Sequence, residues 1–260
     1  MADPIVFAHR GFAGSYPENT VAAVRGAVDH GADAVEIDVQ PTADGDVVVF
    51  HDRRLDGPAD GDGLTDGAGV VWEQSTADVT AARVLGTDEC VPLLSELLSA
   101  VPAHVTVNIE LKNPGSDAVR PGEALAADER ATASERWEPF VESVVMVTDD
   151  FGHDFLFSSF CEGALAALDT NAQNGQLAAL VAPNCATAGE TVSLRYDVDA
   201  VHPPIEQFGG EDGTDWTAVA DGIGASVNAW TARDWRDARR ALNGGADGVI
   251  ADYPGLLSYR

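Results

Sequence analysis

The sequence predicts an α/β fold, a (β/α)8 TIM barrel formed by a single domain over residues 1–260. Short apolar runs recur along the whole chain and alternate with segments of helical period, as expected for repeated β-α units around a parallel sheet. Eight such runs in 260 residues match the size of an eight-stranded barrel. An open, doubly wound sheet is the alternative, because periodicity does not show whether a sheet closes.

The expected strands are short and rich in Val, Ile, Phe and Ala. They cover residues 5–9, 34–39, 105–112, 155–160, 176–181, 200–202, 226–231 and 248–252. A further extended run at 47–51 follows the second strand after the turn-forming segment Pro-Thr-Ala-Asp-Gly. An extra element is therefore expected between the second and third strands of the barrel.

The clearest helix begins after Asn19, a favourable N-cap residue, and ends at Gly31. Val21, Val24 and Val28 recur on one of its faces. Other helices are expected at 93–100, 138–147, 163–171 and 232–242. Two polar stretches, 56–69 and 114–136, are expected to be solvated loops inserted into this frame.

The charge balance excludes several classes of partner. With 43 acidic and 15 basic residues the formal net charge is −28, which repels nucleic acid and anionic membrane surfaces. Lys112 is the only lysine among the basic residues, the others being Arg. This composition resembles that of a halophilic protein, in which molar salt screens the self-repulsion. An acidic protein without salt adaptation is the alternative.

Neither a membrane span nor export is expected. The sequence has no apolar run of about 18 residues, and its first residues lack the basic and apolar regions of a signal peptide. Cys90, Cys161 and Cys185 are odd in number and form no C-x-x-C motif. We therefore expect a cytoplasmic protein with reduced cysteines, and the sequence sets no oligomeric state.

Three carboxylates occupy strand positions that predict a metal site. Glu36 and Asp38 share one face of their strand, because the apolar residues lie at the odd positions. Two carboxylates about 5 Å apart repel by about 3 kcal/mol at an effective dielectric near 20, so the pair needs a cation, a shared proton or basic neighbours. Glu110, on the next barrel strand, could complete an oxygen site for a hard cation such as Mg²⁺ or Ca²⁺.

Basic residues lie at the same expected strand ends. Lys112 shares the face of Glu110, and its ammonium can bind a phosphate oxygen as a point charge; an ion pair with Glu110 is the structural alternative. Arg10 offers a planar, always charged fork for a phosphate, and we expect Gly11 to let the backbone approach that phosphate closely.

His9 and His51 each end an apolar run, where parallel α/β folds carry their chemistry. Two imidazoles can serve as acid and base in the cleavage of one phosphodiester. We expect His9 to act as the base and His51 as the acid. Asp252, at the end of the last strand, is expected to be structural.

Five short motifs occur in order along the chain. They are His9-Arg10-Gly11, Pro17-Glu18-Asn19-Thr20, residues 31–39, Asp44-Gly45 leading to His51-Asp52, and Glu110-Leu111-Lys112. In residue type, order and separation they resemble the glycerophosphodiester phosphodiesterase family. Weaker similarity at 91–96, 159–160, 228–231 and 252–255 extends the resemblance over nearly the whole chain.

The resemblance implies a phosphoric diester hydrolase with a TIM barrel and a defined set of site residues. These are a divalent metal on Glu36, Asp38 and Glu110, the acid/base pair His9 and His51, and Arg10 and Lys112 on the phosphate. The ion would be Mg²⁺ or Ca²⁺, with Mn²⁺ as a further candidate. The implied substrate is a small molecule, a glycerophosphodiester derived from a deacylated phospholipid, and a cyclic phosphate is the expected intermediate.

Other expectations concern the edges of the site. The family's small insertion after the second strand is reduced here to about residues 53–90, so headgroup contacts cannot be transferred. Phe160 and Trp230 are expected either to form an apolar wall for the glycerol carbons or to pack in the core. Glu18 and Asn19 either support the site or, for Asn19, only cap the helix.

Two other functions remain open on this sequence. One is a phospholipase D-like lyase that stops at the cyclic phosphate, and the other is a non-catalytic protein that binds phosphorylated polyols. The presence of both histidines argues against the binding protein, because binding alone does not need two proton-transfer groups.

Overall fold

A closed barrel of eight parallel strands forms the centre of the protein. The computed structural model describes residues 3–57, 63–172, 175–209 and 214–258. Neighbouring strands pair in the order β1-β9-β8-β7-β6-β5-β4-β2, and β1 pairs with β2 to close the ring. The strands are β1 (Ile5–His9), β2 (Ala34–Pro41), β4 (Thr106–Leu111), β5 (Phe155–Ser159), β6 (Gln176–Leu180), β7 (Ala200–His202), β8 (Ser226–Ala232) and β9 (Gly248–Ala251). The barrel prediction is confirmed, and the open sheet is excluded.

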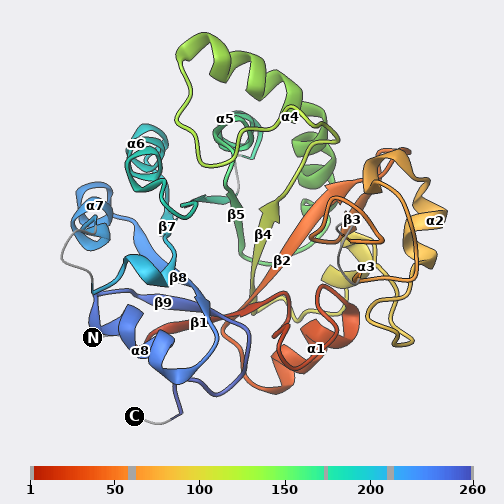
Figure 1. Cartoon of the computed structure of the whole chain (residues 1–260), viewed down its shortest axis with the longest axis horizontal. Helices are drawn as coiled ribbons and strands as arrows, with labels where there is room; N and C mark the ends of the chain where they lie inside the picture. Colours follow the sequence, from red (N-terminus) through yellow and green to blue (C-terminus); the bar gives the residue numbers. More distant parts are fainter. Residues whose placement is uncertain (1–2, 58–62, 173–174, 210–213, 259–260) are drawn as a thin grey trace.

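Helices surround the strands on the outside of the barrel (Figure 1). They are α1 (Val21–Asp29), α3 (Leu94–Leu98), α4 (Ala127–Thr148), α5 (Glu162–Asn171), α6 (Ala186–Tyr196), α7 (Trp216–Ile223) and α8 (Trp235–Asn243). A short 3-10 helix, Ile205–Gln207, lies between β7 and α7. Within the described residues, no helix is long and apolar enough to cross a membrane.

The barrel strands separate an outer apolar core, packed between the sheet and the helices, from the space inside the barrel. Val35, Ile37 and Val39 of β2 are fully buried and belong to the large apolar core that also includes the inner faces of the helices. Alternate strand residues point into the barrel. At one end of this inner space a small apolar cluster closes it, formed by Phe7, Ala34, Leu156, Ala178, Ala200 and Ile250. Several polar side chains, among them Glu36, Asp38 and Glu110, occupy inward positions nearer the carboxyl ends of the strands.

The insertion after β2 has its own small core. Strand β3 (Val47–Val49) pairs antiparallel with β2, and a 3-10 helix (Val71–Glu73) and α2 (Thr76–Ala81) follow it. Their apolar side chains pack together around Val48, Phe50 and Leu55. The predicted insertion is therefore confirmed for its described residues, while 58–62 lie outside them. This packing fixes the chain on both sides of His51.

Several local expectations were wrong. The N-cap of α1 is Thr20, whose hydroxyl accepts a hydrogen bond from the Ala23 amide, whereas Asn19 is turned towards the barrel. The stretch 114–136 is only partly a loop, because α4 begins at Ala127 and continues past Pro139. Helices α6 and α7 were not expected. The α6 segment has little apolar period and buries only Val192 and Ser193, whereas Trp216, Val219 and Ile223 of α7 do follow a helical period that was overlooked.

Candidate active site

A cavity of about 280 Å³ opens among the carboxyl ends of the barrel strands. Eight of the nine predicted site residues line it: His9, Arg10, Glu36, His51, Glu110, Lys112, Phe160 and Trp230. The ninth, Asp38, is buried beside them, with 1% of its surface exposed. Six elements far apart in the sequence therefore contribute to one small space.

Three acidic side chains form a tight cluster at this cavity. Asp38 on β2 lies in register with Glu110 on β4, and Glu36 lies one inward position before Asp38. One oxygen of each of the three carboxylates lies within 4.8 Å of the other two. The Asp38 Oδ1 atom is buried and accepts no hydrogen bond. An oxygen-only ligand set with an unused buried acceptor suits a hard divalent cation.

The pKa values of two carboxylates in the cluster shift in opposite directions. Burial, together with repulsion from Asp38 and Glu110, raises the pKa of Glu36 well above its usual range. Burial alone would also raise the pKa of Asp38. The positive charges of Arg10, His51 and Lys112 outweigh burial and hold the pKa of Asp38 below its usual range. A bound divalent cation would relieve the repulsion that Glu36 experiences.

Two cations lie beside these carboxylates. Arg10 donates to Glu18 Oε1 at 2.7 Å, and its Nε lies 3.2 Å from Asp38 Oδ2. Lys112 Nζ lies 2.6 Å from Glu110 Oε1 and 3.6 Å from Asp38 Oδ1. Burial opposes the Lys112 charge, but Glu110 and Asp38 raise its pKa, so the ammonium is retained. The ion pair with Glu110 that was the structural alternative is present, and both cations line the cavity.

Gly11 occupies a position where the backbone itself requires glycine. Its φ is +77°, and a Cβ atom at this position would lie 2.6 Å from the Cβ of Ala23. Glycine is therefore required so that the loop after β1 can pack against α1. This packing fixes the preceding peptide, in which the Arg10 amide donates to Glu36 Oε2 at 2.9 Å.

His9 and His51 each contact an aspartate through the same ring nitrogen, Nδ1. His9 Nδ1 lies 2.6 Å from Asp252 Oδ1, and His51 Nδ1 lies 2.7 Å from Asp52 Oδ1. A carboxylate only accepts hydrogen bonds, so each Nδ1 carries a proton and each Nε2 is left for chemistry. His9 Nε2 lies 4.0 Å from Glu36 Oε2, on the side of the acidic cluster.

Phe160 and Trp230 form an aromatic wall of the cavity, and Trp230 also packs against the apolar cluster that closes the barrel. Their ring centroids are 5.4 Å apart, and the planes cross at 79°. The Trp230 indole nitrogen donates to the His202 carbonyl at 2.8 Å, and Lys112 Nζ lies 5.7 Å from the Phe160 ring centroid. The wall is thus fixed in place and adjoins a positive charge.

Four supporting residues were underestimated or missed from the sequence. Asn19 donates to Asp38 Oδ2 at 2.8 Å, and Glu18 pairs with Arg10. Asp252 contacts His9, although it was expected to be only structural. Asn108 lines the cavity and alternates with Glu110 and Lys112 on β4, a pattern visible in the sequence.

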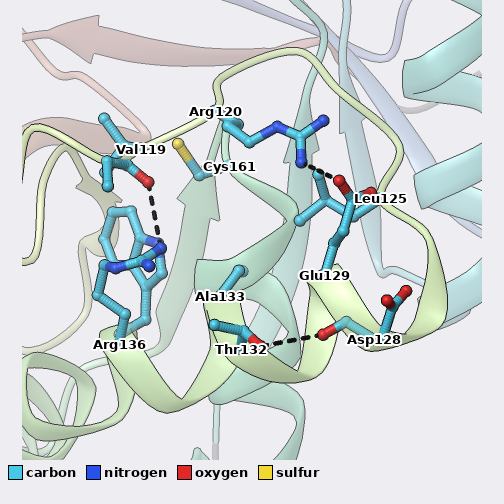
Figure 2. Close-up of a pocket in the computed structure, with 12 residues that line it drawn as sticks. Val119, Arg120, Leu125, Asp128, Glu129, Thr132, Ala133, Arg136 and Cys161 are labelled. Atoms are coloured by element: carbon cyan, nitrogen blue, oxygen red, sulfur yellow. Dashed lines mark hydrogen bonds and ion pairs between the residues drawn. The ribbon is translucent and has the colours of Figure 1, made fainter.

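A second cavity, of about 400 Å³, lies between the segment 118–125 and the first turns of α4 (Figure 2). Its three charged residues other than Asp128 are already paired: Arg120 with Glu129, and Arg136 with the Ala118 carbonyl. Burial, followed by the nearby Glu110 charge, raises the pKa of the Cys161 thiol to about 12, so this thiol is a poor nucleophile. The paired histidines and the acidic cluster belong to the smaller cavity.

Comparison with known proteins agrees with this geometry. The model of the glycerophosphoryl diester phosphodiesterase family matches residues 9–256. The chain belongs to this family. Its members are phosphoric diester hydrolases, as the motifs predicted.

Three relatives match over nearly their full length. The chain is 31% identical to the uncharacterized protein YqiK of Bacillus subtilis (strain 168), covering 96% of this chain and 95% of that protein. It is 30% identical to a glycerophosphodiester phosphodiesterase of Bacillus altitudinis, with 96% and 94% covered. A phosphodiesterase of Oleispira antarctica, solved with the product sn-glycerol-3-phosphate, superposes with a TM-score of 0.78 at 26% identity, covering 98% and 96% of the two chains.

Proposed function

We propose that this protein hydrolyses glycerophosphodiesters to glycerol phosphate and an alcohol, with the help of one divalent cation. The observation that carries the proposal is the pair His9 and His51, each held by an aspartate at Nδ1, in one cavity with a three-carboxylate cluster. Family membership and the product bound by the Oleispira phosphodiesterase support the substrate class. The whole chain, residues 1–260, would form this one catalytic domain.

The histidines perform the proton transfers in this reaction. One histidine accepts the proton of a glycerol hydroxyl at Nε2 while that oxygen attacks phosphorus. The other donates its Nε2 proton to the leaving alcohol oxygen as the phosphorus–oxygen bond breaks. The resulting cyclic phosphate is opened by water with the two roles exchanged. We keep His9 as the first base and His51 as the first acid.

The remaining residues bind and orient the substrate. Arg10 and Lys112 contact nonbridging phosphate oxygens, and Phe160 and Trp230 enclose the glycerol carbons. Glu36, Asp38 and Glu110 would hold the cation, which when bound neutralises charge on the phosphate and lowers the pKa of a coordinated hydroxyl. Mg²⁺ or Ca²⁺ suits three carboxylates, and Mn²⁺ is a further candidate.

Hydrolysis of a mixed set of glycerophosphodiesters tests the proposal. Metal-stripped protein in molar KCl is resupplied with Mg²⁺, Ca²⁺ or Mn²⁺, and release of glycerol phosphate is followed. We expect release only with a divalent cation, and a fall in kcat of at least about 10²-fold for His9→Ala and for His51→Ala. The same ions should raise the melting temperature of the native protein, and less that of Glu36→Gln, because they bind the folded state.

Other outcomes would assign the protein differently. Accumulation of a persistent cyclic phosphate would identify a lyase. Folded protein that binds glycerol phosphate but releases no product with any ion would identify a binding protein. A His51→Ala variant with nearly full turnover would overturn the catalytic assignment.

A further inference from the structure

Asn108 is a buried amide without a partner at the catalytic cavity. It lies on β4, one inward position before Glu110, and only 1% of its surface is exposed. Neither its Nδ2 nor its Oδ1 makes a hydrogen bond. Among the described residues that line the cavity, it is the only amide side chain. Buried polar groups in native proteins are nearly always paired, so both atoms point to a missing polar partner.

The chemistry of an amide defines that partner. The amide Nδ2 donates hydrogen bonds and Oδ1 accepts them. A hydroxyl group can bond to either atom, because it both donates and accepts. A phosphate oxygen at neutral pH accepts only, and Arg10 and Lys112 are better placed to bind it. An uncharged alcohol is therefore the natural ligand of Asn108.

The depth of Asn108 in the barrel selects which alcohol it meets. Asn108 lies beside Glu36 in the sheet register, but the longer Glu36 side chain extends to the strand ends, where it accepts from the Arg10 amide. Two other residues that line the cavity, Leu180 and Ile250, are apolar and suit carbon atoms. The amide thus lies at the cavity floor, one inward position deeper than Glu110 and beside the apolar Leu156 of β5.

We infer that Asn108 binds the terminal hydroxyl of the glycerol unit and makes the enzyme selective for glycerol over a deoxygenated alcohol. The inference rests on the proposed function, in which the hydroxyl next to the phosphate is the nucleophile. The other glycerol hydroxyl lies at the far end of the carbon chain and reaches the cavity floor. Asn108 is thereby a specificity-determining residue of this site.

Two substrates that differ in one oxygen test this inference. They are glycerophosphoethanolamine and the analogue in which 1,2-propanediol replaces glycerol, which keeps the reacting hydroxyl and lacks the terminal one. We expect the wild-type kcat/KM to be at least about tenfold higher for the glycerol substrate, because the analogue leaves the buried amide unpaired. In Asn108→Leu the ratio should fall to within about threefold of unity.

The ratio is measured within one preparation, so it does not depend on the folded fraction of a variant. Ser158→Ala is the matched control, because Ser158 is also buried with an unpartnered hydroxyl but does not line the cavity. It should keep the wild-type ratio. Equal turnover of both substrates by the wild type, or an unchanged ratio in Asn108→Leu, would overturn the inference and leave Asn108 as a site for water or for the cation.

A binding experiment separates this inference from the proposed function. Calorimetry with glycerol 3-phosphate and 1,2-propanediol 1-phosphate, which lacks only the terminal hydroxyl, needs no turnover and can be done with wild type, Asn108→Leu and Asn108→Ala. A preference of at least about tenfold for glycerol 3-phosphate, lost in both variants, would support the Asn108 site even if no diester were hydrolysed. Equal affinity for the two phosphates in the wild type would refute it even if hydrolysis were confirmed.

Discussion

Asp252 Oδ1 lies 2.6 Å from His9 Nδ1, and this contact joins the end of the last barrel strand to the end of the first. The two residues are far apart in sequence, but β1 and β9 are neighbours because the barrel is closed. Burial opposes the Asp252 charge, yet the hydrogen bond with His9 holds the pKa of Asp252 below its usual range. Asp252 is therefore ionised and orients the imidazole.

Asp252→Asn should lower kcat while leaving KM within about threefold. The amide removes the charge that favours protonated Nδ1, so the ring loses its fixed tautomer, and a loss of at least about tenfold is expected. Steady-state kinetics measure the effect, and Asp252→Glu should recover part of kcat. The exposed Asp221→Asn in α7 is the control and should behave as wild type. Equal kcat in Asp252→Asn and wild type would show that Asp252 has no positioning role.

His202 gives the fold a dependence on pH away from the catalytic histidines. The side chain is fully buried, its Nε2 accepts from Asn228 Nδ2, and its ring lies against Phe7. Burial lowers the pKa of His202 to about 3. An unfolded histidine titrates near 6.5, so between these values the folded state binds fewer protons than the unfolded state.

The unfolding free energy should therefore fall as the pH decreases below about 6.5, by up to about 1.4 kcal/mol per pH unit from this group. His202→Leu should show a shallower dependence, measured by denaturant unfolding at constant molar KCl. His30→Gln is a control because His30 is exposed. If His202→Leu and wild type lost stability in parallel, His202 would not be the group responsible.

The strand pattern and the site were predictable for the same physical reason. Inward residues alternate with buried apolar ones, so Glu36, Asp38 and Glu110 could be assigned to one face from the sequence alone. The position of Asp252 beside His9 could not be predicted, because it depends on closure of the barrel between β9 and β1, which periodicity does not encode. Helix α6 buries few side chains and shows little apolar period, so its sequence gives a weak signal. Helix α7 has a helical apolar period at Trp216, Val219 and Ile223 but spans only residues 216–223, and this short signal was overlooked.

Salt should stabilise this protein. At low ionic strength the net charge of −28 destabilises the compact state through repulsion, and the Debye length falls from about 10 Å at 0.1 M to about 3 Å at 1 M salt. We expect the melting temperature to rise as KCl increases from about 0.1 M to about 3 M. NaCl at equal ionic strength should act similarly, since screening does not depend on the cation. A constant melting temperature across this range would contradict the halophilic interpretation.

Lys112 is the only lysine of the chain, and its surroundings explain why arginine would not serve there. Its ammonium contacts Glu110 and Asp38, and its side chain is 17% exposed beside the Phe160 ring. A guanidinium is wider and would pair with Glu110 through two hydrogen bonds, competing with the cation for that carboxylate.

Lys112→Arg should therefore lower kcat/KM by at least about tenfold although the positive charge is kept. The variant should also bind the divalent cation more weakly. This is measured as a higher cation concentration for half-maximal activity. Arg236→Lys makes the opposite exchange on the exposed face of α8, where Arg236 stacks on Trp235, and should leave activity unchanged. If Lys112→Arg were fully active at the wild-type metal concentration, a positive charge alone would suffice at this position, and the single lysine would have no catalytic reason.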